Sequence, residues 1–600
     1  MVGLGLCLAE RGGLLQGAAA VPWRSLRANV VSSSIYERFD WDEHWYPVCW
    51  ARDCKPDAPT KLTLFDKDYA VVVHSDGSAP LAVRDRCPHR LAALSEGRLT
   101  SQGWLQCAYH GWSFDANGSC RSVPQQQQTP TAATLAGACV EAYPARIVQG
   151  MLWIFPGRRL HPAGSAEAAD TAKALPPLPP VPTVAEMEEG SGYRWTPAVR
   201  DLPIDYSILV ENILDPDHGL FAHQAPQFDL YSADRDSPQD VSVRQLPEMR
   251  SVLIESRVEA RPKLTGSGDR DPRAQPPPVG ISTFQPPCKM VTCRCFSLTR
   301  PYVSPDVTPH FPYISPAFVV VARRRDVKSG ETKFLACFWV CPVGVGRSRF
   351  MAAGVAKGAP FALPRWLVHI GLNNFLDQDT HLLATQQTHV LGAELEHSRR
   401  SRAWEGHGAG QGAGQGAGQG AGEAAGEAAG EGAGEGALVR RQLYKYRSPT
   451  ERMLIQVGRF LDAAVPSMPG RYAIPERFVE QCPPRAHTLD RWSQHTQICA
   501  DSRRLVARMR WVRALAAGAA AARALSRLSG VRVSLAAACG SPATLALGAL
   551  ALGAHLGLRE FRFKYVEAKR DRDLNRIPDK FSDERLEAPS AERNLVQAAE

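Results

Sequence analysis

The stretch Cys87-Pro-His89, followed after seventeen residues by Cys107-Ala-Tyr-His110, decides the fold of this chain. Each half offers one cysteine thiolate and one histidine imidazole. Thiolates and imidazoles are the side chains that bind iron and zinc in proteins. The pattern therefore predicts a metal centre held by two short loops, with Cys87, His89, Cys107 and His110 as its ligands.

The mixed composition of each loop separates two kinds of metal centre. In a Rieske [2Fe–2S] cluster, two cysteines hold one iron and two histidines hold the other. A Cys2His2 zinc site, the alternative, usually pairs cysteine with cysteine in one half. Because each loop here contributes one residue of each kind, the pattern favours the cluster. No further cysteine lies within either loop to brace the cluster with a disulfide.

Short apolar and β-branched runs surround this stretch and predict an all-β domain over residues 39–160. Turn residues such as Asp76-Gly77 separate the runs, which is typical of small antiparallel strands. The predicted strands are Lys61–Phe65, Ala70–His74, Leu81–Arg84 and Gly150–Phe155. Residues 161–192 are rich in Ala, Pro and Gly, and we expect a linker or an extended strap there.

A second candidate centre lies in the stretch Asp205–His223. Its apolar residues recur at helical spacing, and His218 and His223 follow, five residues apart. Two neutral imidazoles and one carboxylate make the facial triad of a mononuclear non-haem Fe(II) oxygenase. The carboxylate must come from later in the chain, where Asp377 and Asp379 stand at the start of a predicted helix. We expect one of them to cap this helix and the other to bind the metal.

The region between these stretches predicts the catalytic fold. Runs at residues 250–257, 317–323 and 332–340 indicate an antiparallel sheet. Helices packed on that sheet would enclose a pocket at the iron, so we expect residues 193–500 to form an α+β catalytic domain. A Gly-Ala-rich tract at 405–437 has almost nothing to bury, and we expect a disordered insertion there.

Both ends of the chain carry segments outside these domains. Residues 1–35 are basic and acid-poor, as in an organelle transit peptide. Val533–Leu558 contains no charged residue in 26 positions, more than the about 20 that span a bilayer. Residues 503–568 therefore predict a basic and transmembrane segment that anchors the protein in a membrane, and residues 569–600 form a polar tail.

The composition describes a globular protein of 600 residues with 44% hydrophobic and 22% charged residues. The net charge is +9, but the arginines are concentrated near the C-terminus, so we expect no nucleic-acid partner. Apart from Cys87 and Cys107, the fifteen cysteines form no spaced framework, which argues against a disulfide-rich secreted domain.

Several of these stretches together resemble one family, the plastid Rieske non-haem iron oxygenases, which includes pheophorbide a oxygenase, chlorophyllide a oxygenase and the Rieske protein of the inner-envelope translocon. The similar pieces are Phe39–Trp41, Trp45–Pro47, Cys87–Ala92, Leu94–Gly97, Cys107–Trp112, Glu211–His218 and Trp492–Cys499. The resemblance covers nearly everything from Phe39 to about Ala568, apart from the Gly-Ala tract.

This resemblance implies further roles for single residues. Asn212 and Asp215 would lie beside the iron, and Asp215 would link a cluster histidine of one subunit to an iron histidine of its neighbour in a homotrimer. The carboxylate ligand would precede a Gln by about seven residues, which favours Asp379 over Asp377. Relatives often carry Cys-x-x-Cys where this chain has Cys499-Ala-Asp-Ser502. The second cysteine is absent here, which puts thiol regulation in doubt.

The expected function is a monooxygenase that uses O2 and electrons from ferredoxin to oxygenate a chlorin such as pheophorbide a or chlorophyllide a. Its cofactors would be a [2Fe–2S] cluster and a mononuclear Fe(II). By resemblance it would lie in the chloroplast, at the inner envelope or thylakoid membrane, with its catalytic domain facing the stroma. The alternative is a membrane-bound Rieske electron-transfer protein of a translocon; the pair His218 and His223 favours the enzyme.

Overall fold

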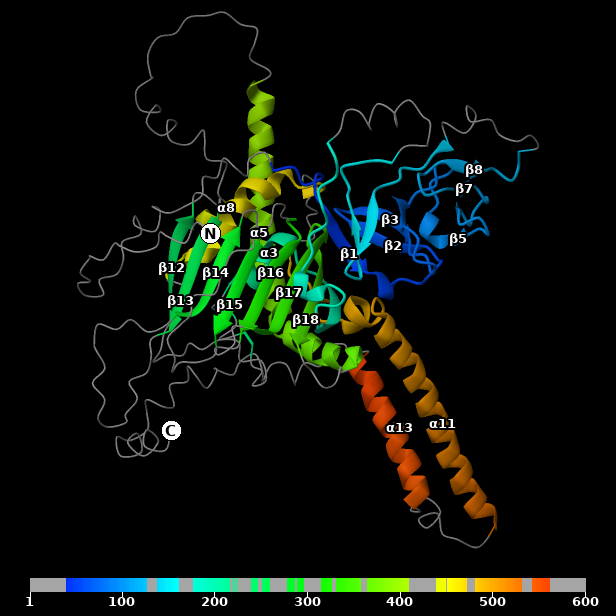
Figure 1. The fold of residues 1–600 in the computed structure, drawn as a ribbon. Helices are drawn as coiled ribbons and strands as arrows, with labels where there is room; N and C mark the ends of the chain where they lie inside the picture. Colours follow the sequence, from blue (N-terminus) through cyan, green and yellow to red (C-terminus); the bar gives the residue numbers. More distant parts are fainter. Residues whose placement is uncertain are drawn as a thin grey trace, which may run out of the picture.

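The computed structural model (Figure 1) gives the architecture of most of the chain. It describes residues 39–126, 138–160, 176–215, 218, 222–223, 239–246, 251–258, 278–285, 289–295, 315–325, 331–357, 364–408, 439–448, 451–471, 481–530 and 542–561. The predicted transit peptide, residues 409–437 of the predicted Gly-Ala insertion and the polar tail lie outside these residues.

The N-terminal part is all-β, as predicted, and consists of three small antiparallel sheets. Their strand orders are β1-β10-β9, β2-β3-β4 and β5-β6-β7-β8. The strands are β1 (Tyr46–Trp50), β2 (Thr60–Leu64), β3 (Lys67–Val72), β4 (Leu81–Arg84), β5 (Arg98–Leu99), β6 (Leu105–Gln106), β7 (Ser113–Phe114), β8 (Cys120–Ser122), β9 (Ala145–Val148) and β10 (Met151–Ile154). The first cluster loop connects β4 to η4 (Leu94–Glu96), and the second connects β6 to β7 within the third sheet.

The catalytic part is built on one eight-stranded sheet of order β11-β18-β17-β16-β15-β14-β13-β12. The strands are β11 (Tyr193–Leu202), β12 (Gln239–Leu246), β13 (Ser251–Val258), β14 (Pro278–Gln285), β15 (Lys289–Cys295), β16 (Phe318–Arg325), β17 (Thr332–Gly344) and β18 (Arg347–Lys357). The prediction of a purely antiparallel sheet is wrong at one place, because β15 and β16 pair in parallel. The segment between them, 296–317, has the dozen or more residues that a crossover requires.

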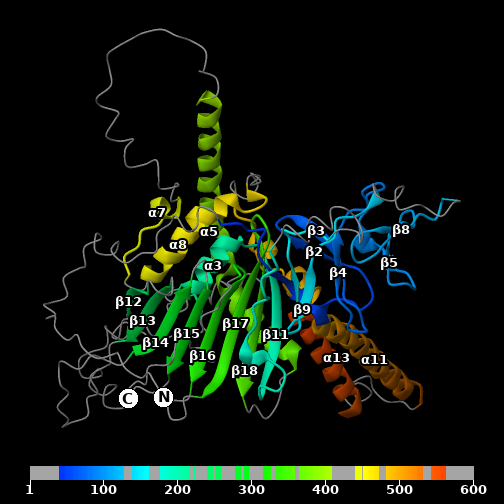
Figure 2. The ribbon, with the colours of Figure 1, turned by 45° about the horizontal axis from the view of Figure 1, so that its top comes forward.

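Helices cover this sheet. α3 (Tyr206–Leu214) packs between the sheet and two further helices, α5 (Arg365–Gly408) and α8 (Arg452–Ala464) (Figure 2). α5 includes residues 405–408, so the prediction that the disordered insertion begins at 405 is wrong for these four residues. The remaining helical elements are η3 (Ala51–Asp53), η4 (Leu94–Glu96), η6 (Ala185–Met187), α7 (Val439–Leu443), η10 (Val465–Ser467), α10 (Arg485–Thr488), η12 (Trp492–Thr496), α11 (Ala500–Gly530) and α13 (Pro542–Phe561).

A continuous apolar core joins the sheet of β1, β9 and β10 to the catalytic part. Trp41, Trp45 and Trp50 are buried in it. Their indole N–H groups donate to the carbonyls of Ala464, Pro179 and Ala198, each at 2.8 Å. Buried indoles need such partners, because an unpaired N–H in an apolar core costs free energy. Cys87 and Cys107 of the cluster loops belong to a second, separate apolar core. The N-terminal part therefore packs on the catalytic part through the sheet of β1, β9 and β10 and carries the cluster loops on its other core.

Residues 176–192, at the end of the predicted linker, lie against the protein. Val181, Val184 and Met187 are buried, and Gln149 bonds the backbone of Val184 in both directions. These contacts make the described part of this segment an anchored strap.

The C-terminal helices α11 and α13 lie side by side as a hairpin that extends away from the body (Figures 1 and 2). Among the helices that the structure describes, none combines the length and the apolarity that crossing a membrane requires. The single apolar helix predicted over Val533–Leu558 is not seen as such: α13 begins at Pro542, and residues 531–541 lie outside the description.

Candidate functional site

The two cluster loops have the same backbone hydrogen-bond pattern. In the first, Leu91 N–H donates to the Cys87 carbonyl at 2.9 Å and Cys87 N–H donates to Ala92 at 2.8 Å. In the second, Gly111 N–H donates to Cys107 at 3.0 Å and Cys107 N–H donates to Trp112 at 2.8 Å. Leu91 and Gly111 occupy equivalent positions and both have positive φ, 62° and 76°. Such a turn costs Leu91 backbone strain, which suits a loop whose geometry serves a ligand.

The four predicted ligands of the cluster face one another from these loops. Cys87 and Cys107 are each 2% exposed, and the rings of His89 and His110 lie 4.6 Å apart. His89 stacks on Trp112 at 4.6 Å with an angle of 4° between the planes. Burial, together with the neighbouring Cys107, raises the pKa of Cys87 to about 11. A buried thiol pair of this kind becomes stable as thiolates only beside a cation.

The spacing of these donors separates a two-iron cluster from a single zinc ion. The donor atoms of a tetrahedral zinc site lie roughly 3.3–3.8 Å from one another. No three of the residues Cys87, His89, Cys107 and His110 bring their ligand atoms within 4.8 Å of one another. A wider distribution suits a cluster, whose cysteine and histidine pairs hold different irons.

The second predicted centre is more compact. His218, His223 and Asp379 bring ligand atoms within 4.8 Å of one another. His223 Nε2 lies 3.5 Å from Asp379 Oδ2, and the two imidazole rings are 5.2 Å apart. His218 and His223 follow α3, whose N-cap Asp205 accepts from the N–H of Ser207 at 3.0 Å, while Asp379 comes from α5.

Neighbouring oxygens fix the orientation of both imidazoles. His218 Nδ1 lies 2.6 Å from the carbonyl of Asp215, and His223 Nδ1 lies 3.2 Å from Oε1 of Gln378. A carbonyl oxygen only accepts, so Nδ1 carries the proton in each ring and Nε2 offers its lone pair. Burial lowers the pKa of His218, although Asp379 and Asp215 oppose this shift. Neutral imidazoles are the form that binds a metal.

Asp377 and Asp379 have different partners in the structure, although the residue pattern alone did not show which of them would bind a metal. Neither stands at a helix start, because α5 begins at Arg365; the prediction that one of them caps the helix is wrong. Two residues apart on a helix point about 200° apart around its axis. Asp379 faces the histidines, whereas Asp377 lies 2.5 Å from Arg200 and 2.6 Å from Arg491.

A cavity of about 310 Å³ adjoins the triad. Its wall is lined by Glu211, Asn212, Asp215, His218, Ala222, Asp379, Leu382, Leu383, Gln386, Tyr444, Lys445, Tyr446, Glu451 and Leu454. Asn212 and Asp215, which the resemblance assigned to the iron site, are both among these residues. Asp215 contacts His218 through its backbone carbonyl at 2.6 Å and through Oδ1, which accepts from the backbone N–H of His218 at 3.4 Å.

A buried carboxyl with a shifted pKa lies on the cavity wall. Burial raises the pKa of Glu211 to about 7, although Arg440 and the hydroxyl of Tyr444 lower it in part. Tyr444 donates to Glu211 at 3.1 Å and accepts from the side-chain amide of Gln386 at 2.9 Å. Glu211 can therefore gain or lose a proton near neutral pH.

Sequence reasoning did not identify three residues of this site. Phe375 stacks on His223 at 3.6 Å between ring centroids, and Gln378 orients the same ring. Tyr444 reaches the cavity from beyond the Gly-Ala tract. Helical spacing from Asp379 could have suggested Phe375, four residues before it, but nothing in the sequence marks Tyr444.

Comparison with known proteins gives two domain matches. Residues 44–144 match the Rieske [2Fe–2S] domain, and residues 284–395 match pheophorbide a oxygenase. The first match contains all four predicted cluster ligands, and the second contains Asp379.

Longer alignments with single proteins cover more than half of the chain. The chain is 37% identical to pheophorbide a oxygenase of Arabidopsis thaliana over 60% of this chain and 58% of the relative. It is 29% identical to Protein TIC 55 of the same plant, over 58% of this chain and 54% of the relative. Among solved structures, dicamba monooxygenase bound to dicamba aligns with a TM-score of 0.36 and 17% identity, over 63% of this chain and 92% of that one.

The chain thus spans a little over half the length of the curated relatives described here. Its Rieske domain and its pheophorbide a oxygenase domain occur in the order of the two sites built above. By these two matches the chain is similar to the Rieske oxygenases of the pheophorbide a oxygenase group.

Proposed function

We propose that this protein is a monooxygenase that uses O2 and electrons from ferredoxin to oxygenate a chlorin of the chlorophyll pathway, such as pheophorbide a or chlorophyllide a. One observation carries the proposal: His218, His223 and Asp379 converge within 4.8 Å beside a cavity. Two imidazoles and one carboxylate are the donor set of non-haem Fe(II) oxygenases. An electron carrier alone would have no use for that set.

The residues present fit both cofactors. Cys87, Cys107, His89 and His110 would hold the [2Fe–2S] cluster, and His218, His223 and Asp379 would hold the mononuclear iron. When bound, the cluster supplies single electrons and the iron supplies O2 chemistry. The protein contributes orientation, because the Asp215 carbonyl and Gln378 hold the two imidazoles with Nε2 toward the metal position.

The cavity wall supports a large, mostly apolar substrate with an acidic group. Leu382, Leu383 and Leu454 give it an apolar surface, and exposed Lys445 offers a cation. Both named chlorins carry a free carboxylate, which Lys445 would pair with at the entrance. The volume of about 310 Å³ is at the low end for ligand pockets, so we expect one edge of the macrocycle to enter.

Polar groups on the same wall would handle protons. Glu211 titrates near neutral pH and bonds the hydroxyl of Tyr444 at 3.1 Å, so a proton can pass between Glu211 Oε2 and the cavity through that hydroxyl. Asn212 would orient a polar edge of the substrate beside the metal. Asp215 would accept a hydrogen bond from a cluster histidine of a neighbouring subunit in a homotrimer. Leu91 and Tyr109, which are exposed at the tips of the cluster loops, suit such a contact.

The hairpin of α11 and α13 supports attachment to a plastid membrane. It exposes Trp511 (70%), Leu515 (68%), Leu525 (65%) and Leu545 (59%), an unusual amount of apolar surface for a protein in water. Arginines such as Arg510 and Arg513 alternate with them on α11 and would pair with anionic lipid headgroups. Because the similar proteins are chloroplastic, we propose that this membrane lies in the chloroplast, at the inner envelope or a thylakoid, with the catalytic part on the stromal side.

The test begins with the cofactors and ends with turnover. Iron, acid-labile sulfide and an EPR spectrum of the reduced protein measure the cluster. Single-turnover reactions with reduced cluster, O2 and each candidate chlorin measure product, with His218→Ala as the control that keeps the cluster. Product from the wild type and none from the variant is the expected result. Cluster oxidation without product across the chlorins would favour the electron carrier.

A further inference from the structure

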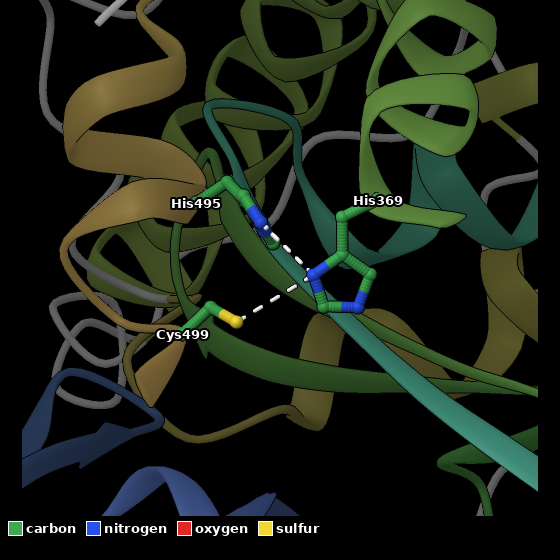
Figure 3. Close-up of side chains that lie close together, drawn as sticks. All are labelled: His369, His495 and Cys499. Atoms are coloured by element: carbon green, nitrogen blue, oxygen red, sulfur yellow. Dashed lines mark hydrogen bonds between the residues drawn. The ribbon is translucent and has the colours of Figure 1, made fainter. Parts of the chain in front are cut away.

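A second compact group of metal-binding side chains lies apart from both iron sites. His369, His495 and Cys499 bring ligand atoms within 4.8 Å of one another, and all three are buried (Figure 3). His369 lies on α5, His495 lies in the π-helical turn η12, and Cys499 directly precedes α11. We name these three residues, with the buried hydroxyl of Ser502, the Cys499 cluster.

Backbone carbonyls fix the tautomers of both histidines. His369 Nε2 lies 2.9 Å from the carbonyl of Pro197, and His495 Nδ1 lies 2.7 Å from the carbonyl of Val199. Both carbonyls only accept, so these two nitrogens carry the protons. The remaining nitrogens, Nδ1 of His369 and Nε2 of His495, are then unprotonated, and they face each other at 3.1 Å. Two lone pairs at this distance repel unless a cation lies beside both.

The distances suit a metal ion. In tetrahedral zinc sites, two imidazole nitrogens lie about 3.3 Å apart, and a nitrogen and a thiolate sulfur lie about 3.5 Å apart. Here the two nitrogens are 3.1 Å apart and Cys499 Sγ is 3.5 Å from His369 Nδ1. Ser502 Oγ lies 3.1 Å from His495 Nε2, which makes it a candidate for the fourth position.

The surroundings favour a thiolate at Cys499. Burial acts against a charged thiolate, whereas the guanidinium group of Arg365 favours it, and a metal ion beside the two unprotonated ring nitrogens would favour it further. Arg365 does not occupy the cluster itself, because Asp53 accepts two hydrogen bonds from its guanidinium group at 2.7 Å each. Cys499 is 0% exposed, so this thiolate cannot act as a nucleophile on a dissolved substrate.

We propose that His369, His495 and Cys499 bind a structural divalent metal ion of the zinc class, with Ser502 or a water as the fourth ligand. A thiolate with two imidazoles selects zinc over calcium or magnesium, which prefer oxygen ligands. The metal ties α5, η12 and the start of α11 together, beside the β11 carbonyls that orient its ligands. His369 precedes Asp379 by ten residues on α5, about 15 Å along the axis, so the two sites are separate.

A network of protons is the competing interpretation. The thiol of Cys499 could donate to His369 and the hydroxyl of Ser502 to His495, with one proton shared between the rings. That arrangement needs no metal, so measuring the metal content separates the two interpretations.

The experiment uses the full-length protein. Zinc and iron per chain are measured by mass spectrometry after incubation with zinc chloride and dialysis, and zinc-edge X-ray absorption identifies the ligands. We expect about one zinc per chain, with one sulfur at about 2.3 Å and nitrogens at about 2.0–2.1 Å. A wild-type protein that holds no metal beyond its iron, or zinc without a sulfur ligand, would overturn the proposal.

Paired variants locate the metal. Cys499→Ala and His369→Gln should lose the zinc and keep the iron. Two control variants should keep both metals: Cys482→Ala, which changes a half-buried cysteine, and His381→Gln, which changes another histidine of α5. Zinc retained in Cys499→Ala would place it elsewhere and refute the site. If the variants of the Cys499 cluster do not fold, the presence or absence of a sulfur ligand in the zinc-edge spectrum of the wild type still tests the site. His218→Ala should lose mononuclear iron and keep zinc, which makes this result independent of the proposed oxygenase function.

Discussion

The same substitution at two neighbouring aspartates of α5 should have opposite consequences. Asp377→Asn removes the charge that lies 2.5 Å from Arg200 and 2.6 Å from Arg491. Asp379→Asn removes the charge that faces His218 and His223. Both side chains are buried, both substitutions preserve size, and the positions share a helix, so each variant is the control for the other.

The magnitude for Asp377 follows from its partners. Burial alone would raise the pKa of this carboxyl, but Arg200 and Arg491 hold it below its usual range, so it is a carboxylate in the folded protein. Neutralising it removes the carboxylate that both buried guanidinium groups contact, and removing one partner of a buried pair costs about 3–5 kcal/mol. Asparagine can still accept a hydrogen bond, so we expect the lower end, about 3 kcal/mol, or roughly a 150-fold change in the folding equilibrium.

The carboxyl group of Asp379 faces the imidazoles of His218 and His223, and Nε2 of His223 lies 3.5 Å from it. We expect Asp379→Asn to change the unfolding free energy by less than about 1 kcal/mol while mononuclear iron is lost. Urea unfolding midpoints and iron per chain, corrected for the cluster by acid-labile sulfide, measure both effects. A stable Asp377→Asn protein that lacks iron, or an Asp379→Asn protein that retains it, would show that the two roles are assigned the wrong way round.

Three further predictions concern Glu211 on the cavity wall, the carboxyl group of Asp215 and the Gly-Ala tract. Burial raises the pKa of Glu211 from 4.5 to about 7, so between these pH values the folded state binds more protons than the unfolded state, and the free energy of unfolding should fall by up to about 3 kcal/mol as pH rises from 4.5 to about 7. Glu211→Gln should abolish this pH dependence of unfolding, whereas an unchanged slope would contradict the shift. Asp215→Asn keeps the backbone carbonyl that orients His218, so iron should remain while cluster reoxidation in single turnover slows; reoxidation at the wild-type rate would exclude the carboxylate as the bridge. Deleting residues 411–426, four repeats of the Gly-Ala tract, should leave the thermal midpoint and iron content unchanged, because the tract has no apolar face to pack; a lower midpoint would show that it does.

Local patterns in the sequence predicted the elements whose chemistry is local. The strands near the cluster and helix α3 follow from alternation and helical spacing, and the structure confirms them. The loops at Cys87 and Cys107 carry their ligands within a few residues, so the ligand types alone indicated the cofactor. The parallel pair of β15 and β16 could not be predicted, because both strands look alike in sequence and only the path of the chain between them decides their direction.

The carboxylate of the triad marks the limit of single-residue reasoning. Asp377 and Asp379 are equivalent as residue types, and only the helical rotation of about 200° between them gives them different partners. The rotation follows from helix geometry, but the sequence did not indicate which side chains would contact Asp377. Arg200 stands 177 residues away on β11, and Arg491 stands 114 residues away on the other side. An ion pair between distant segments leaves no spacing in the sequence.

The Cys499 cluster shows how a partial sequence signal can be overlooked. His495 and Cys499 are four residues apart, a spacing that brings two ligands to one side of a helical turn. By resemblance Ser502 stands where relatives often carry a second cysteine, which suggested thiol chemistry. In the structure Ser502 bonds His495 at 3.1 Å, and His369 completes the group from 126 residues away. Three donors that converge in a dry interior can bind a metal ion. Because Ser502 offers a hydroxyl where a second thiol could stand, no disulfide can form between positions 499 and 502, and this favours metal binding over thiol oxidation.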